Sequence, residues 1–133
     1  MIEESGIPGS EVLGIGSDIV DVHRFRGVLQ RRPSLAGRLF TSGELDYAER
    51  FVDPTERLAA RFAAKEATLK ALGFGLGNMR MVDIEVVRTS KGSPRLVLRG
   101  EAAAKATACG VSRWLVTISH TSSLASATVL ALR

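Results

Sequence analysis

Hydrophobic and polar residues follow one another along this chain in patterns that predict both strands and helices. Residues 12–20 (VLGIGSDIV) are apolar and β-branched apart from two glycines, a serine and an aspartate, which predicts a buried strand with close backbone approaches. Val22, Phe25 and Leu29 then recur at spacings of three and four residues. A helix is therefore expected to follow the strand and to end near Pro33.

The longest predicted helix spans residues 54–72, a stretch rich in alanine and leucine without an internal glycine. Asp53 is its candidate N-cap, Pro54 suits its first position, and Gly73 is its candidate stop. The other expected elements are a short helix from Ser42, a hairpin of residues 81–89 and 95–98, a helix over 101–109, and a strand pair of 114–118 and 124–132. Hairpins with segregated helices predict an α+β fold, with a mostly antiparallel sheet and one long packed helix.

Length and residue usage narrow the class of protein. A chain of 133 residues suits a single domain, expected here over residues 11–133 after a flexible N-terminal tail of residues 1–10. One cysteine and two histidines exclude an intramolecular disulfide framework and a cysteine-based zinc cluster. No apolar run approaches the roughly 20 residues that a membrane span needs, and the first ten residues lack the apolar core of a secretion signal. A cytoplasmic protein with no membrane partner is expected.

The formal net charge of +4 is concentrated in one early segment. Residues 22–43 contain no acidic residue and five arginines: Arg24, Arg26, Arg31, Arg32 and Arg38. Such a patch suits an acidic partner. The single tryptophan and the single tyrosine lie outside the segment, so the stacking platforms of nucleic-acid-binding surfaces are missing. The alternative is that the segment is simply the solvated face of a helix.

Two charged residues of the long helix lie beside its apolar stripe. The stripe, at helical spacing, consists of Leu58, Phe62, Leu69 and Leu72. Lys65 falls inside it and Glu66 at its edge, where a charge is costly unless it is paired or bound to a ligand. The alternative is that Lys65 extends its ammonium past the apolar face to solvent and that Glu66 pairs with Lys70.

A further acid lies within the first predicted strand. Strand alternation places Gly14, Gly16 and Asp18 on one face, where a bare backbone that leads to a carboxylate suits the close approach of a ligand. The alternative is that Asp18 or Asp21 caps the next helix. His120, at the expected end of another strand, is a candidate site residue, although a lone histidine is more often structural.

Taken together, these segments resemble the 4′-phosphopantetheinyl transferases, and more narrowly their short, single-domain members that modify acyl carrier proteins. The resemblance runs from about residue 12 to the C-terminus. It rests on GIGSDI at 14–19 followed by Arg24-Phe25, on RFAAKEA at 61–67 followed by Lys70-Ala71, and on ISHT at 118–121. The first ten residues have no counterpart in the family.

The resemblance implies a Mg²⁺-dependent enzyme that transfers the 4′-phosphopantetheine arm of coenzyme A to a serine of an acyl carrier protein and releases 3′,5′-ADP. It implies a homotrimer with sites between subunits, and no nucleic-acid partner. The residue roles that it implies are Mg²⁺ binding and catalysis by Asp18 and Glu66, catalysis by Lys70, coenzyme A binding by Arg61, Lys70 and His120, and carrier docking by Arg24. Two isolated carboxylates without soft ligands are also what Mg²⁺ takes beside substrate phosphates.

Two other classes of function stay open at this point. One is a small basic module that binds RNA or an acidic protein without catalysis, and the other is a metal-dependent phosphohydrolase that has no carrier substrate. The residues assign neither the general base nor the natural carrier, and they leave open whether acylated coenzyme A is accepted.

Overall fold

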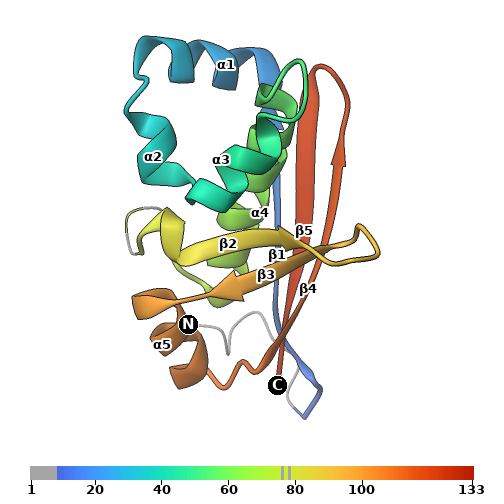
Figure 1. Cartoon of the computed structure of the whole chain (residues 1–133). Helices are drawn as coiled ribbons and strands as arrows, with labels where there is room; N and C mark the ends of the chain where they lie inside the picture. The colour runs from blue at the N-terminus through green and yellow to red at the C-terminus, as the bar shows by residue number, and fades with distance from the viewer. Residues whose placement is uncertain (1–8, 76, 78) are drawn as a thin grey trace.

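A long helix, α4, packs along a three-stranded antiparallel sheet in the computed structural model, which describes residues 9–75, 77 and 79–133 (Figure 1). The elements in chain order are β1 (Val12–Asp21), α1 (Val22–Arg31), α2 (Leu35–Leu39), α3 (Ser42–Ala48), α4 (Thr55–Leu72), the 3₁₀ helix η2 (Met81–Asp83), β2 (Ile84–Arg88), β3 (Pro94–Leu98), α5 (Gly100–Ala108), β4 (Arg113–His120) and β5 (Leu124–Leu132). The α+β class with antiparallel pairing is confirmed. The expected tail of residues 1–10 lies almost entirely outside the described residues.

The sheet joins the two ends of the described chain. Its strand order is β1-β5-β4, so the first strand pairs with the last one, and β2 and β3 form a separate two-stranded sheet. Figure 1 shows this hairpin crossing in front of the long strands, with α1, α2 and α3 at one end of the molecule and α5 at the other. The core lies between α4 and the inner face of the three-stranded sheet, where the buried residues are mostly alanine, valine and leucine.

The sheet approaches α4 closely at Gly16. A Cβ atom on this residue would lie 1.9 Å from the carbonyl oxygen of Ala67 and 2.7 Å from the amide nitrogen of Ala71. Both alanines are fully buried, so small side chains on the helix match the missing side chain on the strand. The expectation that the glycine face leaves room for a ligand is therefore wrong at Gly16, because α4 occupies that space.

Lys65 is the centre of a buried polar network. Its ammonium donates to Glu44 Oε1 at 2.6 Å and to the carbonyl oxygens of Met81 at 3.0 Å and Ile84 at 2.6 Å. Glu44 Oε2 accepts in turn from the amide of Val86 at 2.9 Å. Burial lowers the pKa of Lys65 and the Glu44 charge opposes that shift. The interpretation that Lys65 reaches solvent is thus wrong, since its side chain is fully buried and ties α4 to α3 and β2.

The helix ends follow the predicted capping residues closely. Thr41 and Glu44 form a capping box at the start of α3, and Gly73 ends α4 with a φ of 79°. Asp21 caps α1 by accepting from the amide of Arg24 at 2.9 Å, which leaves the Asp18 carboxylate for another role. Helix α4 begins at Thr55, one residue later than predicted, with Pro54 at the N-cap position expected for Asp53, and the Asp53 carboxylate accepts from the amide of Thr55 at 3.0 Å. The sequence pattern missed α2.

Candidate active site

The structure brings together three of the residues singled out in the sequence, Asp18 on β1 and Glu66 and Lys70 on α4. The Lys70 ammonium donates to Asp18 Oδ1 at 3.0 Å and to the carbonyl oxygen of Ser17 at 2.9 Å. Glu66 lies one helical turn before Lys70 on the same helix. Asp18 faces α4 because it lies two residues beyond Gly16 on the same side of the strand. The proposed alternative pairing of Glu66 with Lys70 gives way to the Lys70–Asp18 ion pair.

The two carboxylates influence each other. Burial raises the pKa of Glu66, and the neighbouring negative charge of Asp18 raises it further, whereas the positive charge of Lys70 lowers it. Asp18 is largely shielded, with 13% of its side chain exposed, while the Lys70 side chain is 53% exposed. Two carboxylates and one ammonium carry a formal charge of −1, so the cluster favours an additional cation.

The donor set at this cluster fits Mg²⁺. Carboxylate oxygens are the hard ligands that Mg²⁺ prefers, and this ion usually takes one or two carboxylates and completes its shell with water and substrate phosphates. Across the described part of the chain, no group of three or more histidine, cysteine or acidic residues forms a ready-made cage. Asp18 and Glu66 therefore suit a metal that is completed by a phosphate substrate rather than one held by protein alone.

Arg61 lies in a different cluster, on the side of α4 that faces α3. Only 3% of its surface is exposed, and its guanidinium lies over the ring of Tyr47 with its carbon 4.3 Å from the centroid. Burial lowers the pKa of Arg61 and the charge of Glu44 opposes the shift. The Arg61 Nε atom is buried and has no hydrogen-bond partner among the residues that the structure describes.

Three further arginines surround the same aromatic side chains. The guanidinium carbons of Arg50 and Arg88 lie 5.7 and 5.4 Å from the Tyr47 ring centroid, and that of Arg57 lies 3.7 Å from the Phe51 ring. We call Arg50, Arg57, Arg61 and Arg88 the arginine cluster. Sequence reasoning missed three of its members, because Arg50 lies in the turn after α3, Arg57 on α4 and Arg88 on β2, far apart along the chain. The i, i+4 spacing of Arg57 and Arg61 on one helix is the signal that was present.

His120 contacts the first turn of α4 from the last residue of β4. Its Nδ1 atom is 3.2 Å from Glu56 Oε1, and both side chains are about a quarter exposed. Glu56 precedes Glu66 by ten residues, which corresponds to about 15 Å along a helix. Along α4, Arg61 lies midway between Glu56, which contacts His120, and Glu66 of the Asp18 cluster.

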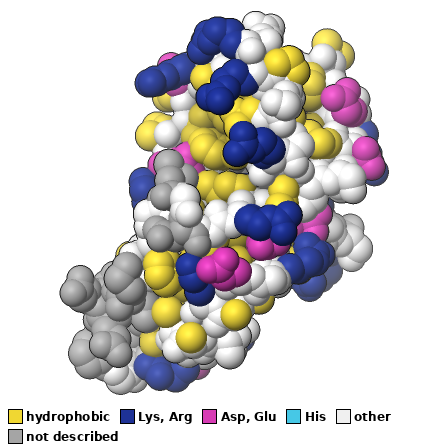
Figure 2. Space-filling model, turned by 90° about the vertical axis from the view of Figure 1, so that its left-hand side faces the viewer, with side chains coloured by type: hydrophobic (Ala, Val, Ile, Leu, Met, Phe, Trp, Pro, Cys, Tyr) yellow, Lys and Arg dark blue, Asp and Glu magenta, His cyan; other side chains and the backbone are white. Residues whose placement is uncertain are grey.

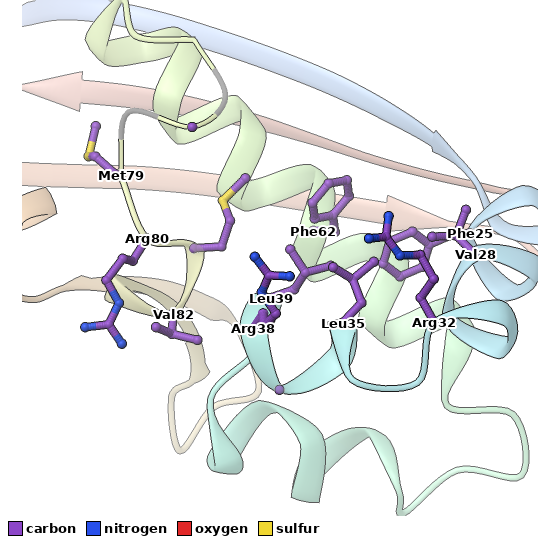
Figure 3. Close-up of a pocket in the computed structure, with 13 residues that line it drawn as sticks. Phe25, Val28, Arg32, Leu35, Arg38, Leu39, Phe62, Met79, Arg80 and Val82 are labelled. Atoms are coloured by element: carbon purple, nitrogen blue, oxygen red, sulfur yellow. The ribbon is translucent and has the colours of Figure 1, made fainter.

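A cavity of about 810 Å³ opens between α1, α2 and residues 79–82. Figure 3 shows Phe62 of α4 lying beside Phe25 and opposite Leu35, with Arg32 and Arg38 nearby. Phe62 is one turn before Glu66 on α4, but Asp18, Glu66 and Lys70 are not among the residues that line the cavity. In Figure 2, Lys and Arg side chains surround exposed hydrophobic surface on this face of the molecule. Arg24 lies on α1 and is exposed, as its predicted role requires.

The family is established by comparison with known proteins. A family model described as the 4′-phosphopantetheinyl transferase superfamily matches residues 14–129. These residues include the candidate site residues on α4, and the chain belongs to this superfamily.

Within the superfamily, the relatives are holo-[acyl-carrier-protein] synthases. The enzyme of that name from Streptomyces coelicolor is 45% identical over 120 residues, which cover 90% of this chain and 97% of the relative. The crystal structure of the holo-[acyl-carrier-protein] synthase from Neisseria meningitidis is 33% identical, with a TM-score of 0.82, and covers 92% of this chain and 99% of that one. A structure from Bacillus anthracis in complex with CoA (3′,5′-ADP) is 32% identical, with a TM-score of 0.75 and coverage of 91% and 96%.

Proposed function

We propose that Asp18, Glu66 and Lys70 form the reaction centre through which this chain acts as a holo-[acyl-carrier-protein] synthase. The enzyme transfers the 4′-phosphopantetheine group of coenzyme A to a serine hydroxyl of an acyl carrier protein and releases 3′,5′-ADP. The observation that carries the assignment is the contact of Lys70 with Asp18 beside Glu66, which brings two carboxylates and an ammonium together. Mg²⁺ bound there supplies positive charge to the pyrophosphate of coenzyme A.

The residues of the chain act on the pyrophosphate by position and charge. Asp18 and Glu66 hold the metal, and the half-exposed ammonium of Lys70 binds an oxygen of the pyrophosphate. The serine oxygen of the carrier attacks the phosphorus attached to pantetheine, and the bond from that phosphorus to 3′,5′-ADP breaks. Such a transfer needs alignment and charge neutralisation more than covalent help from the protein.

We assign the nucleotide end of coenzyme A to the N-terminal half of α4. The unpartnered, buried Nε of Arg61 supports binding of an anion, because its N–H group can donate a hydrogen bond to a ligand oxygen. The arginine cluster supplies the positive charge for the 3′-phosphate, and His120 contacts the same half of the helix. Arg61 and Glu56 lie about 7.5 and 15 Å from Glu66 along the helix, and such spacings suit a ligand as long as coenzyme A, whose phosphates lie at separate points.

The acidic partner of the arginine segment is the acyl carrier protein. Arg24 lies on α1, three residues after the Asp21 cap and close in sequence to Asp18, while Arg32 and Arg38 line the cavity beside Phe62. Exposed charges of this kind act mainly on encounter rate and register. The apolar cavity provides a place for the hydrophobic side chains of a docked helix, with arginines around it for the acidic ones.

We further propose a homotrimer with sites shared between subunits, supported by the outer face of the three-stranded sheet. The side turned away from α4 exposes four large apolar side chains, Ile15 (54% exposed), Ile19 (65%), Leu115 (57%) and Leu124 (45%). Leu130 pairs with both Ile15 and Leu115 and joins them into one row across the strands. An apolar surface that is continuous across three strands is typical of a subunit interface.

The oligomer is tested by light scattering on Ile19→Lys. A lysine on the apolar face is expected to yield monomers, because its ammonium would be buried without a partner. Val52→Lys is the matched control, since Val52 is fully exposed and lies between α3 and α4, away from the sheet. A trimeric Ile19→Lys protein, or a wild type that is monomeric at micromolar concentration, would exclude this interface.

The catalytic assignment is tested by the mass of an apo carrier protein after incubation with coenzyme A, Mg²⁺ and the enzyme. Wild type is expected to add one phosphopantetheine, whereas Glu66→Gln and Asp18→Asn lose the transfer while remaining folded. The two losses are expected to be non-additive, because both residues serve one ion. Glu49→Gln removes an exposed carboxylate at the end of α3 and is the control. Activity within a few-fold of wild type in Glu66→Gln would remove Glu66 from the site.

Carrier docking is tested by Arg24→Glu. We expect a higher KM for the carrier and a weaker dependence of KM on salt, with coenzyme A affinity unchanged, because exposed charges are screened over about 8 Å at physiological ionic strength. Arg95→Glu reverses an exposed charge on β3 and is the matched control. A basic RNA-binding module would instead lose salt-sensitive RNA binding in Arg24→Glu. If the KM for the carrier changed neither with the substitution nor with salt, Arg24 would have no docking role and α1 would simply present a solvated face.

A further inference from the structure

The ion pair between Lys70 and Asp18 occupies the carboxylate to which the metal is assigned. The ammonium lies 3.0 Å from Asp18 Oδ1 and is held in place by a second hydrogen bond, 2.9 Å, to the carbonyl oxygen of Ser17. Lys70 therefore makes two contacts with consecutive residues of β1, although more than half of its side chain is exposed. These two contacts hold the ammonium against the Asp18 carboxylate although the side chain is exposed.

A divalent cation and this ammonium compete for the same oxygen. Mg²⁺ binds carboxylate oxygens at about 2.0–2.1 Å, so an ion on Oδ1 would place two positive charges within a few ångströms of each other. Repulsion at that separation is substantial even near a protein surface. Glu66 adds a second negative charge to the same place, which favours the divalent ion over the monovalent ammonium.

We propose that Lys70 is the counter-ion of Asp18 in the metal-free protein and leaves this carboxylate when a divalent cation binds. The proposal rests on the metal site of the proposed function. In the metal-free state the ammonium offsets the charge of the two carboxylates and holds Asp18 in place. Once displaced, the long and half-exposed side chain is released beside the metal, where it is available to an incoming phosphate. One lysine thus serves first as a stand-in for the metal and then as a phosphate ligand.

Binding of Mn²⁺ to the protein without coenzyme A or carrier tests the exchange. Mn²⁺ titrations followed by electron paramagnetic resonance are carried out on wild type, Lys70→Met and Lys91→Met. Lys70→Met keeps the length of the side chain and removes the competing charge, so Mn²⁺ binding is expected to tighten about fivefold, the value of an ion pair of this exposure. Lys91→Met removes an equal charge at the exposed tip of the β2–β3 hairpin and is expected to bind Mn²⁺ like wild type.

The outcomes separate this inference from the proposed function. Mn²⁺ affinity that is unchanged or weaker in Lys70→Met overturns the exchange, and if wild type still modifies the carrier, the catalytic assignment stands. A wild type that binds no Mn²⁺ at millimolar concentration overturns the metal assignment, and the exchange with it. Tighter Mn²⁺ binding combined with weaker coenzyme A binding in Lys70→Met supports both roles of the lysine. If Lys91→Met also bound Mn²⁺ more tightly by a similar factor, the change in net charge of the protein would explain the effect, and the exchange would be overturned.

Discussion

The substitution Gly16→Ala is expected to separate β1 from α4 and to destabilise the protein strongly. The added Cβ would lie 1.9 Å from the Ala67 carbonyl oxygen and 2.7 Å from the Ala71 amide nitrogen, and both are backbone atoms that no side-chain rotation can move. To bring this Cβ to 3.0 Å from the oxygen, the two elements must part by about 1.1 Å. The expected loss is about 3 kcal/mol of unfolding free energy or more, at the upper end for overpacked cores.

The same displacement affects catalysis, because Asp18 lies two residues further along the same face of the strand as Gly16. A shift of about 1 Å between Asp18 and Glu66 is expected to lower the transfer rate by about 10²-fold. Chemical denaturation followed by circular dichroism measures the first effect, and the mass of the modified carrier protein measures the second.

Gly37→Ala is the matched control for stability alone, since nothing lies within 4 Å of a Cβ added there and the residue is part of helix α2. Alanine at Gly37 is expected to stabilise the protein by about 0.5–1 kcal/mol. The close-packing argument would be refuted if the free energy of unfolding of Gly16→Ala lay within about 1 kcal/mol of wild type and its transfer rate were unchanged. Other contacts would then have to fix the distance between Asp18 and Glu66.

Three further changes test the electrostatics of α4. Lys65→Met is expected to lower the free energy of unfolding, measured by chemical denaturation, by about 3–5 kcal/mol, because it leaves the Glu44 carboxylate buried without its cation. The double substitution with Glu44→Leu is expected to recover much of this loss. A loss below about 1 kcal/mol in Lys65→Met alone would contradict the argument. Glu66→Gln is expected to stabilise the metal-free protein at neutral pH, because the raised pKa of Glu66 means that ionisation costs stability in the folded state. This gain is expected to vanish as pH falls below the ordinary glutamate value of 4.5, and a gain that is constant with pH would show another cause. His120→Asn is expected to weaken coenzyme A binding by about fivefold in calorimetry, the value of one hydrogen bond, and to leave Mn²⁺ binding unchanged; equal coenzyme A affinity would confine His120 to its contact with Glu56.

Local patterns were enough to predict most elements and the helix ends. Apolar spacing predicted β1, α1 and α4, and short-range capping chemistry placed the start of α3 and the end of α4, since these signals depend only on residues within a few positions of each other. The motifs in the same segments pointed to Asp18, Glu66 and Lys70, which the structure brings together at one end of α4.

Contacts between distant segments had to come from the tertiary structure. The pairing of Lys65 with Glu44 joins residues that are 21 positions apart, and without this partner the lysine looked like a side chain directed to solvent. The glycine face of β1 looked open to a ligand until α4 was seen to pack against Gly16. Likewise, the arginine cluster gathers side chains from separate elements around Tyr47. Sequence spacing carries information about neighbours along one helix or strand, whereas burial and charge pairing depend on which elements meet, and that is decided by how the whole core packs.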